Sequence, residues 1–158
     1  MKLKHLLLTI GLLSSSIIYA QNTFKGLLDK YENEDDVTII SISKSMFNMI
    51  PGNIGKADVN IQNILPKIES LLMITSKKNS VNEKMELEFK SLINSNNNYE
   101  ELMRVRDGKS NIIFIAKKEG DIIKEFIMLI NDETDFVAIQ ILGNFTLEDI
   151  QQITNGKP

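Results

Sequence analysis

The second half of the chain, from Tyr99 onward, carries repeated strand and turn signals, and this pattern constrains the fold more than any other feature. Tyr99, Met103 and Val105 alternate with charged residues, as in a strand with one buried face. Asp107-Gly108 favours a two-residue hairpin turn that follows this strand. Apolar runs separated by turn-forming residues predict further strands at 111–116, 122–130 and 136–142. Together these signals predict a four-stranded antiparallel meander.

The first half of the chain predicts helices and two additional strands. Apolar residues from Phe24 to Tyr31 have helical spacing, and Ser80 with Glu83 forms a capping-box pattern at the start of another helix. Apolar or β-branched runs predict strands at 37–42 and 70–75, and helical patterns occupy 43–50 and 58–65. Thr146, with Asp149 three residues later, predicts the capped start of a final helix. We therefore expect an α+β fold in the order αβαβα-ββββ-α, with a mixed or antiparallel sheet and helices packed on it.

Residues 1–20 have the organisation of a signal peptide. Two lysines precede a run of apolar and small residues at 6–18, and Ala20 supplies the small residue that a signal peptidase requires. The run is shorter than the roughly 20 apolar residues of a membrane-spanning helix. We expect cleavage after Ala20, export to the periplasm or the medium, no transmembrane anchor after processing, and a single globular domain over 21–158.

The composition excludes several classes of function. The chain contains no Cys, and its only histidine, His5, lies within the expected leader. Catalysis that needs His or Cys, and transition-metal sites that need imidazole or thiolate ligands, are therefore not expected in the exported chain. Without residues 1–20, which hold two lysines and no acid, the 18 basic and 21 acidic residues leave a formal charge of −5. We expect no cofactor and no nucleic-acid partner.

Two short polar patterns resemble parts of known sites, and each lacks its companions. Ser41 and Lys44 match the S-x-x-K signature of β-lactamases, but the chain has no Ser-Asp-Asn and no Lys-Thr-Gly, and Ser41 falls within an expected strand. Asp132, Glu133 and Asp135 offer oxygen ligands for Ca²⁺ without the spacing of an EF-hand loop. We interpret both as structural, and predict no metal site.

Paired carboxylates are the remaining route to catalysis, because glycosidases use two of them across a cleft. Glu100, Glu101 and Glu125 are the candidates on the expected sheet. Alternation along the strand places Glu100 in solvent. We predict no catalytic and no cofactor-binding residue.

The predicted meander is apolar on both faces, notably at 112–115 and 122–130, whereas an antiparallel sheet with one solvated face should alternate. Either helices cover both faces, or a second subunit or partner covers one of them. The Asp107-Gly108 turn puts Met103, Val105, Ile112 and Phe114 on one face, which we expect to be the core. The other face then holds a possible interaction surface, formed by Leu102, Ile113 and Ile115.

Four segments of the chain, 24–31, 36–47, 99–103 and 143–150, resemble the domain-of-unknown-function family 4252. The resemblance implies a small exported protein of the bacterial envelope and supplies no catalytic residue. We expect a non-enzymatic binding module that contacts a protein partner or a second copy through its sheet. The alternatives are a carboxylate-dependent hydrolase acting on envelope glycans and a regulator of an envelope stress response.

Overall fold

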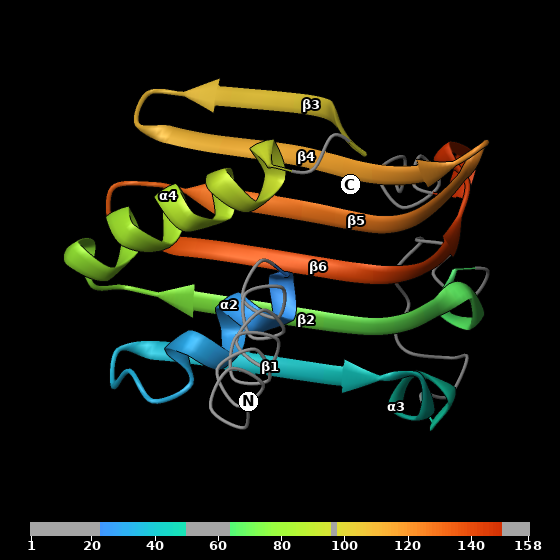
Figure 1. Cartoon of the computed structure of the whole chain (residues 1–158), viewed down its shortest axis with the longest axis horizontal. Coiled ribbons are helices and arrows are strands. Elements are labelled where there is room, and N and C mark those ends of the chain that lie inside the picture. The colour runs from blue at the N-terminus through green and yellow to red at the C-terminus, as the bar shows by residue number, and fades with distance from the viewer. Residues whose placement is uncertain (1–22, 50–63, 96–97, 150–158) are drawn as a thin grey trace, which may run out of the picture.

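A computed structural model describes residues 23–49, 64–95 and 98–149 (Figure 1). The expected leader, and most of the helix expected at 58–65, lie outside these ranges. The elements in chain order are α2 (Phe24–Tyr31), β1 (Val37–Ser43), α3 (Lys44–Met49), the 3₁₀ helix η2 (Leu65–Lys67), β2 (Ile68–Ser76), α4 (Asn79–Asn94), β3 (Tyr99–Asp107), β4 (Ser110–Glu119), β5 (Ile122–Asn131) and β6 (Phe136–Phe145).

The six strands form one sheet in the order β1-β2-β6-β5-β4-β3, and every neighbouring pair is antiparallel. Strands β3 to β6 are a meander in which each strand pairs with the next. The sheet then continues to β2 and β1, which precede the meander in sequence. The expected α+β class is confirmed, and the open choice between a mixed and an antiparallel sheet resolves to antiparallel.

Two hairpin turns of the meander depend on glycines with positive φ. Gly108 (φ 57°) and Gly120 (φ 61°) each occupy the first position of a two-residue turn, and no other described residue has positive φ. This combination is the type II′ turn, which matches the twist of the flanking strands. Because Asp107 pairs with Ser110, the first turn consists of Gly108 and Lys109, one residue later than expected.

Helix α2 begins as its sequence predicts. The Thr23 side chain caps it by accepting a hydrogen bond from the Gly26 amide at 3.0 Å, which satisfies one of the free donors at a helix start. Lys30 at its end pairs with Glu88 of α4 at 2.6 Å. The Tyr31 hydroxyl donates to the same carboxylate at 3.1 Å, so the two helices are tied side by side.

Helix α4 begins one residue before the expected capping box. Its N-cap is Lys78, with no side-chain cap, so the predicted cap at Ser80 is wrong. The helix start is fixed instead by contacts to its surroundings. The Ser76 hydroxyl accepts from the Lys78 amide at 3.2 Å, and the Asn82 side chain donates to the Thr134 carbonyl in the β5–β6 loop at 3.0 Å.

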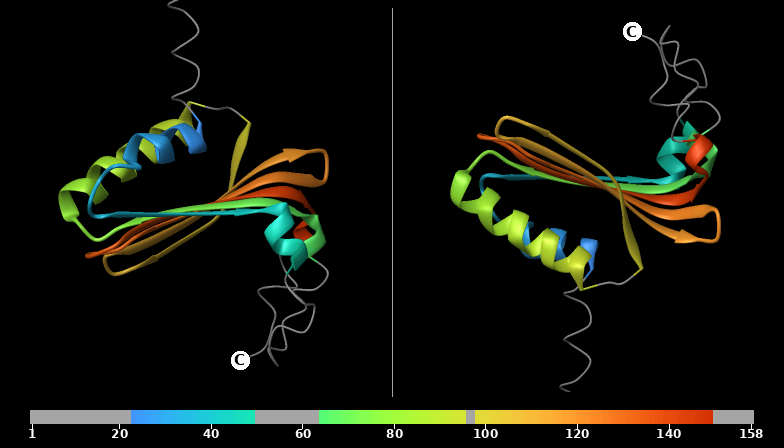
Figure 2. Two further views of the ribbon diagram at one scale, coloured as in Figure 1. Left: turned by 90° about the horizontal axis from the view of Figure 1, so that it is seen from below. Right: turned by 90° about the horizontal axis from the view of Figure 1, so that it is seen from above.

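Helices α2 and α4 cover one face of the sheet, which we call the helix-covered face (Figure 2). Phe89 of α4 stands at the centre of this core, edge-on to Phe24 at 5.0 Å and 5.7 Å from Phe136, measured between ring centroids. The buried side chains of this core are Phe24, Leu27, Leu28, Tyr31, Ile74, Met85, Phe89, Leu92, Ile113, Ile115, Ile127, Leu129, Phe136 and Ala138. Their burial accounts for most of the hydrophobic stabilisation of the fold.

On the face opposite α2 and α4, helix α3 lies at the end of the sheet where β1 ends and β2 begins (Figure 2). A second, smaller hydrophobic cluster packs at this end. Its buried members are Phe47, Ile64, Ile68, Ala116, Ile123 and Phe145. Residues 147–149 are helical here, and the predicted capping box is confirmed, because the Thr146 amide donates to the Asp149 carboxylate at 2.8 Å and the Asp149 amide donates to the Thr146 hydroxyl at 3.2 Å. The Asp149 carboxylate also forms a 2.6 Å ion pair with Lys67. We call α3, η2 and residues 147–149 the end wall.

Candidate functional site

The face of the sheet opposite α2 and α4 carries two rows of side chains that no described helix covers. Register places one residue from each strand in each row, because directly paired residues point to the same face. The first row runs Ile40, Met73, Ile139, Met128, Phe114, Met103, and the second runs Thr38, Thr75, Val137, Ile130, Ile112, Val105. We call these two rows the apolar face. It contains no charged side chain.

Side chains of the apolar face are more exposed than those of the helix-covered face. Met103, Val105 and Ile40, on the edge strands, are 48, 42 and 40% exposed. The side chains on the central strands are half-buried, since flanking strands shield their sides and nothing described lies above them. On the helix-covered face the same strands bury Ile74 and Leu129 almost completely. The apolar face is therefore a bare hydrophobic sheet surface beside the end wall.

On edge strand β3 the apolar and charged residues alternate as expected, but the two sets face the opposite sides from those expected. Glu101 and Arg104 point to the helix-covered side, where they pair with Ile115 and Ile113 of β4. Met103 and Val105 point to the uncovered side. A strand covered on one side only would be expected to turn its apolar residues toward the helices, and β3 turns them away.

The structure confirms that Met103, Val105, Ile112 and Phe114 share one face, and it reverses the role expected for them. They form part of the uncovered surface. Ile113 and Ile115 are 4 and 2% exposed and belong to the core beneath α4, so the expectation that they form a contact surface is wrong. Leu102 packs against the second cluster, because a register shift between Glu101 and Met103 moves it away from the face of Ile113 and Ile115.

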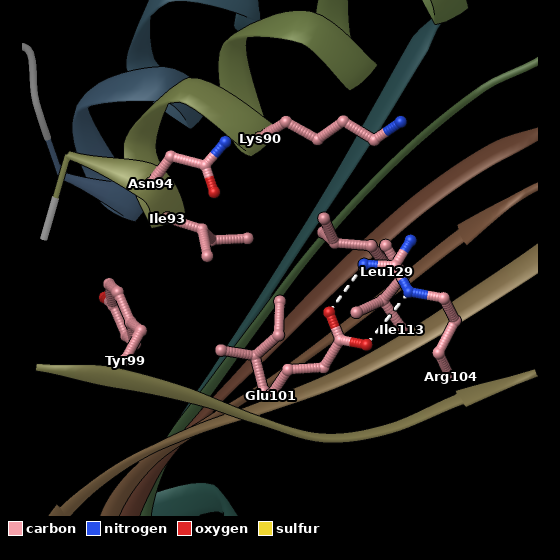
Figure 3. A pocket seen from close by; sticks show the side chains of 9 residues that line it. Lys90, Ile93, Asn94, Tyr99, Glu101, Arg104, Ile113 and Leu129 are labelled. Carbon is pink, nitrogen blue, oxygen red and sulfur yellow. Dashed lines mark hydrogen bonds and ion pairs between the residues drawn. The ribbon is translucent and has the colours of Figure 1, made fainter. Parts of the chain in front are cut away.

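A cavity of about 600 Å³ opens on the helix-covered side between α4 and β3 (Figure 3). Ile93, Ile113 and Leu129 line its apolar side. At its rim the Arg104 guanidinium donates two hydrogen bonds, of 2.9 and 2.5 Å, to the Glu101 carboxylate. These bonds, above all, hold the pKa of the Glu101 carboxyl below its usual range, so it stays ionised near neutral pH and is a poor proton donor.

Tyr99 also lines this cavity and belongs to a polar cluster inside the sheet. Its hydroxyl donates to Glu125 at 2.9 Å, and the Gln140 amide donates to the same carboxylate oxygen. Burial, followed by the charge of Glu125, raises the pKa of the Tyr99 phenol. A protonated phenol that donates to a carboxylate is a structural bridge, and neither group is arranged as a nucleophile with a free base.

The other polar patterns have structural partners as well. Glu100 pairs with Lys118 at 2.5 Å. Asp132 accepts the amides of Thr134 and Asp135 at 2.8 and 2.7 Å, and these bonds, the one from Asp135 foremost, lower its pKa. Such an Asx turn closes the β5–β6 hairpin without an ion. Among residues 23–49, 64–95 and 98–149, no three His, Cys, Asp or Glu side chains are grouped to hold a metal.

The Ser41–Lys44 pattern lies across the boundary between two elements. Ser41 belongs to β1, as expected, and Lys44 is the first residue of α3. The β-lactamase arrangement needs both residues at the start of one helix, so the Lys side chain is not placed to activate the Ser hydroxyl.

A family model matches most of the chain. The family model described as a domain of unknown function, DUF4252, matches residues 31–153, and the chain belongs to this family. Searches of curated proteins and of solved structures each return no significant match. Within the described residues, no helix has the length and apolar character needed to cross a membrane.

Several residues of the apolar face escaped the sequence analysis, chiefly Ile40, Met73, Val137 and Ile139. The signal that points to them is that apolar residues occupy both alternating sets of positions in the segments 37–42, 70–75 and 136–142. That signal shows that both faces of a strand are apolar. It does not show which of the two lies beneath the helices, because that depends on how the chain crosses over the sheet.

Proposed function

We propose that this protein is a non-enzymatic interaction module of the cell envelope and that the apolar face is its binding surface. The leader-like residues 1–20 support export, and the bare sheet surface supports a role in contact with another protein. The observation that carries the proposal is the alternation on β3, where Met103 and Val105 face outward from the helices while Glu101 and Arg104 face inward.

The geometry of the carboxylates argues against a hydrolase. A glycosidase requires two carboxyl groups across a cleft, one of which has a raised pKa and can give up a proton. Glu101 is held by Arg104, Glu100 by Lys118, and Glu125 by Tyr99 and Gln140. Each candidate carboxylate therefore has a structural partner, and this supports binding in preference to hydrolysis.

Photo-crosslinking in cells tests the binding role. The photoreactive residue p-benzoylphenylalanine, placed at Phe114, keeps an aromatic ring in the first row of the apolar face. The matched control carries the same residue at Leu87, which is 70% exposed on α4, on the other side of the molecule. Both chains are expressed from the complete sequence, so that the leader directs them. The proposal predicts protein adducts from position 114 in the envelope fraction and few from position 87.

Two results contradict the proposal. Equal adduct yields from both positions show that position 114 samples its neighbours at random. An absence of protein adducts from position 114, in cells where the chain is folded and exported, shows that the apolar face contacts no protein.

A further inference from the structure

We infer that the occupant of the apolar face is a second copy of this chain, packed sheet to sheet about a twofold axis. This inference rests on the proposed function, since it names the partner at the same surface. Sheets pack face to face about 10 Å apart when both inner faces are apolar. The two rows supply such a face across all six strands, with ten large apolar side chains and two threonines.

The chemistry of the apolar face selects an uncharged partner surface. No member of either row is charged, so a partner that brought a Lys, Arg, Asp or Glu side chain into the centre would bury it unpaired. A second copy brings an apolar sheet of the same width, and the twofold symmetry makes the surface complementary to itself. Thr38 and Thr75 lie toward the β1 edge, where their hydroxyls can remain in contact with water.

The end wall sets the direction of the axis. The wall rises from the apolar face at one end of the strands only (Figure 2). An axis parallel to the strands would set two walls at the same end, where they collide. An axis across the strands puts them at opposite ends, so that each wall closes the free end of the other sheet. The exposed Met46 and Met49 of α3 then flank the contact.

The size of the apolar face indicates a weak dimer. Six strands about 4.8 Å apart, with two rows about 7 Å apart, present roughly 400 Å² per copy in projection. Two copies bury roughly 1,000 Å² of accessible surface, which is near the lower bound for specific interfaces. We expect a dissociation constant in the micromolar range, so that the dimer forms and dissociates over accessible concentrations.

Sedimentation velocity tests the inference. The protein concentration runs from roughly 1 to 300 μM, a range that brackets the expected dissociation constant of the dimer. The chain is expressed from the complete sequence and purified as the cell processes it. Met128→Asp places two like charges close together across the axis and should weaken dimerisation at least about 100-fold. The matched control Leu87→Asp adds the same charge on exposed α4 and should leave dimerisation unchanged. Circular dichroism verifies that both variants are folded.

A labelling measurement separates this inference from the proposed function. The chain has no cysteine, so Ile139→Cys introduces a single thiol on the apolar face. In the dimer this thiol should react with maleimide more slowly as protein concentration rises. If the protein is monomeric at every concentration and its thiol reacts fast, a second copy is not the occupant, and the face remains free to bind a different protein. A monomer whose thiol is protected shows that the chain covers its own face, and both proposals fail. A dimer that persists in folded Met128→Asp uses another surface and overturns the inference.

Discussion

Neighbouring isoleucines on β4 provide a direct comparison of the two faces. Ile113 points into the core beneath α4 and is 4% exposed, whereas Ile112 lies in the second row of the apolar face. Ile→Thr keeps the β-branched shape at both positions, so strand propensity changes little. The two variants therefore differ mainly in what surrounds the new hydroxyl and the lost methyl group.

The expected destabilisation follows from these surroundings. At Ile113 the change removes buried hydrocarbon worth about 1.5 kcal/mol and adds a hydroxyl without a partner, at a further cost of about 1–3 kcal/mol, for a total of about 2.5–4.5 kcal/mol. At Ile112 the hydroxyl reaches water in a row that already contains Thr38 and Thr75, so we expect at most about 1 kcal/mol.

Urea unfolding at low protein concentration, where the monomer prevails, measures both values. We expect the free energies of unfolding of the two variants to differ by at least about 1.5 kcal/mol, with little change in the slope against urea concentration. Equal destabilisation at Ile112 and Ile113 would refute the assignment of the faces, because it would mean that both sides of β4 are enclosed.

Further predictions concern the close approach at β6, the pH dependence, the leader and the β5–β6 loop. Gly143→Ala should lower the melting temperature strongly, since the new Cβ would lie 2.3 Å from the Lys67 carbonyl oxygen, and a calorimetric scan measures this. The Lys67 ammonium, followed by the Thr146 amide, lowers the pKa of Asp149, so this carboxylate stabilises the fold above about pH 4, and the stabilisation is lost as pH falls through the lowered pKa. The free energy of unfolding, measured between pH 2 and 6, should therefore decline less toward low pH in Asp149→Asn than in the unchanged chain. N-terminal mass spectrometry of the exported protein should find Gln21 as the first residue, and recovery of chains that begin at Met1 from the membrane contradicts cleavage. Ca²⁺ should leave the melting temperature unchanged, since backbone amides already satisfy Asp132, and a stabilising shift in its presence would indicate an ion site.

Local signals in the sequence were sufficient for most of the elements. The helical spacing from Phe24 to Tyr31 involves residues close in the chain, and the helix it predicts is confirmed. The capping box at Thr146 and Asp149 is confirmed for the same reason. The cap expected at Ser80 failed because tertiary contacts, among them the bond from Asn82 to the β5–β6 loop, move the N-cap two residues earlier, to Lys78.

The position of β1 and β2 in the sheet could not be read from local patterns. Their apolar and β-branched runs predict strands, but a pairing such as Met73 with Ile139 joins residues far apart in the sequence. The side of the sheet on which α4 lies depends on the same long-range arrangement. A period-two pattern therefore separates Ile112 from Ile113 without deciding which of them is covered.

Because of this ambiguity, the residues of the candidate surface could not be identified from the sequence. From the sequence we predicted that the sheet has more apolar surface than one layer of helices can cover, and the exposed Met103 and Val105 agree with this prediction. It placed that face on Ile113 and Ile115, since the side that carries Phe114 appeared to be the better core. A register shift at Leu102, invisible in a single sequence, further divided the expected residues between two faces.

Methionines already present in the chain can show whether the apolar face is open in the isolated protein and becomes covered on association. Met73, Met103 and Met128 lie in its first row, whereas Met85 is fully buried beneath the helices. Oxidation by hydrogen peroxide, followed residue by residue with mass spectrometry, reports the accessibility of each sulfur. In dilute protein we expect all three to oxidise much faster than Met85, and we expect Met73 and Met128 to become protected as the protein concentration rises. Oxidation of Met73 and Met128 as slow as that of Met85 in dilute protein would contradict this expectation.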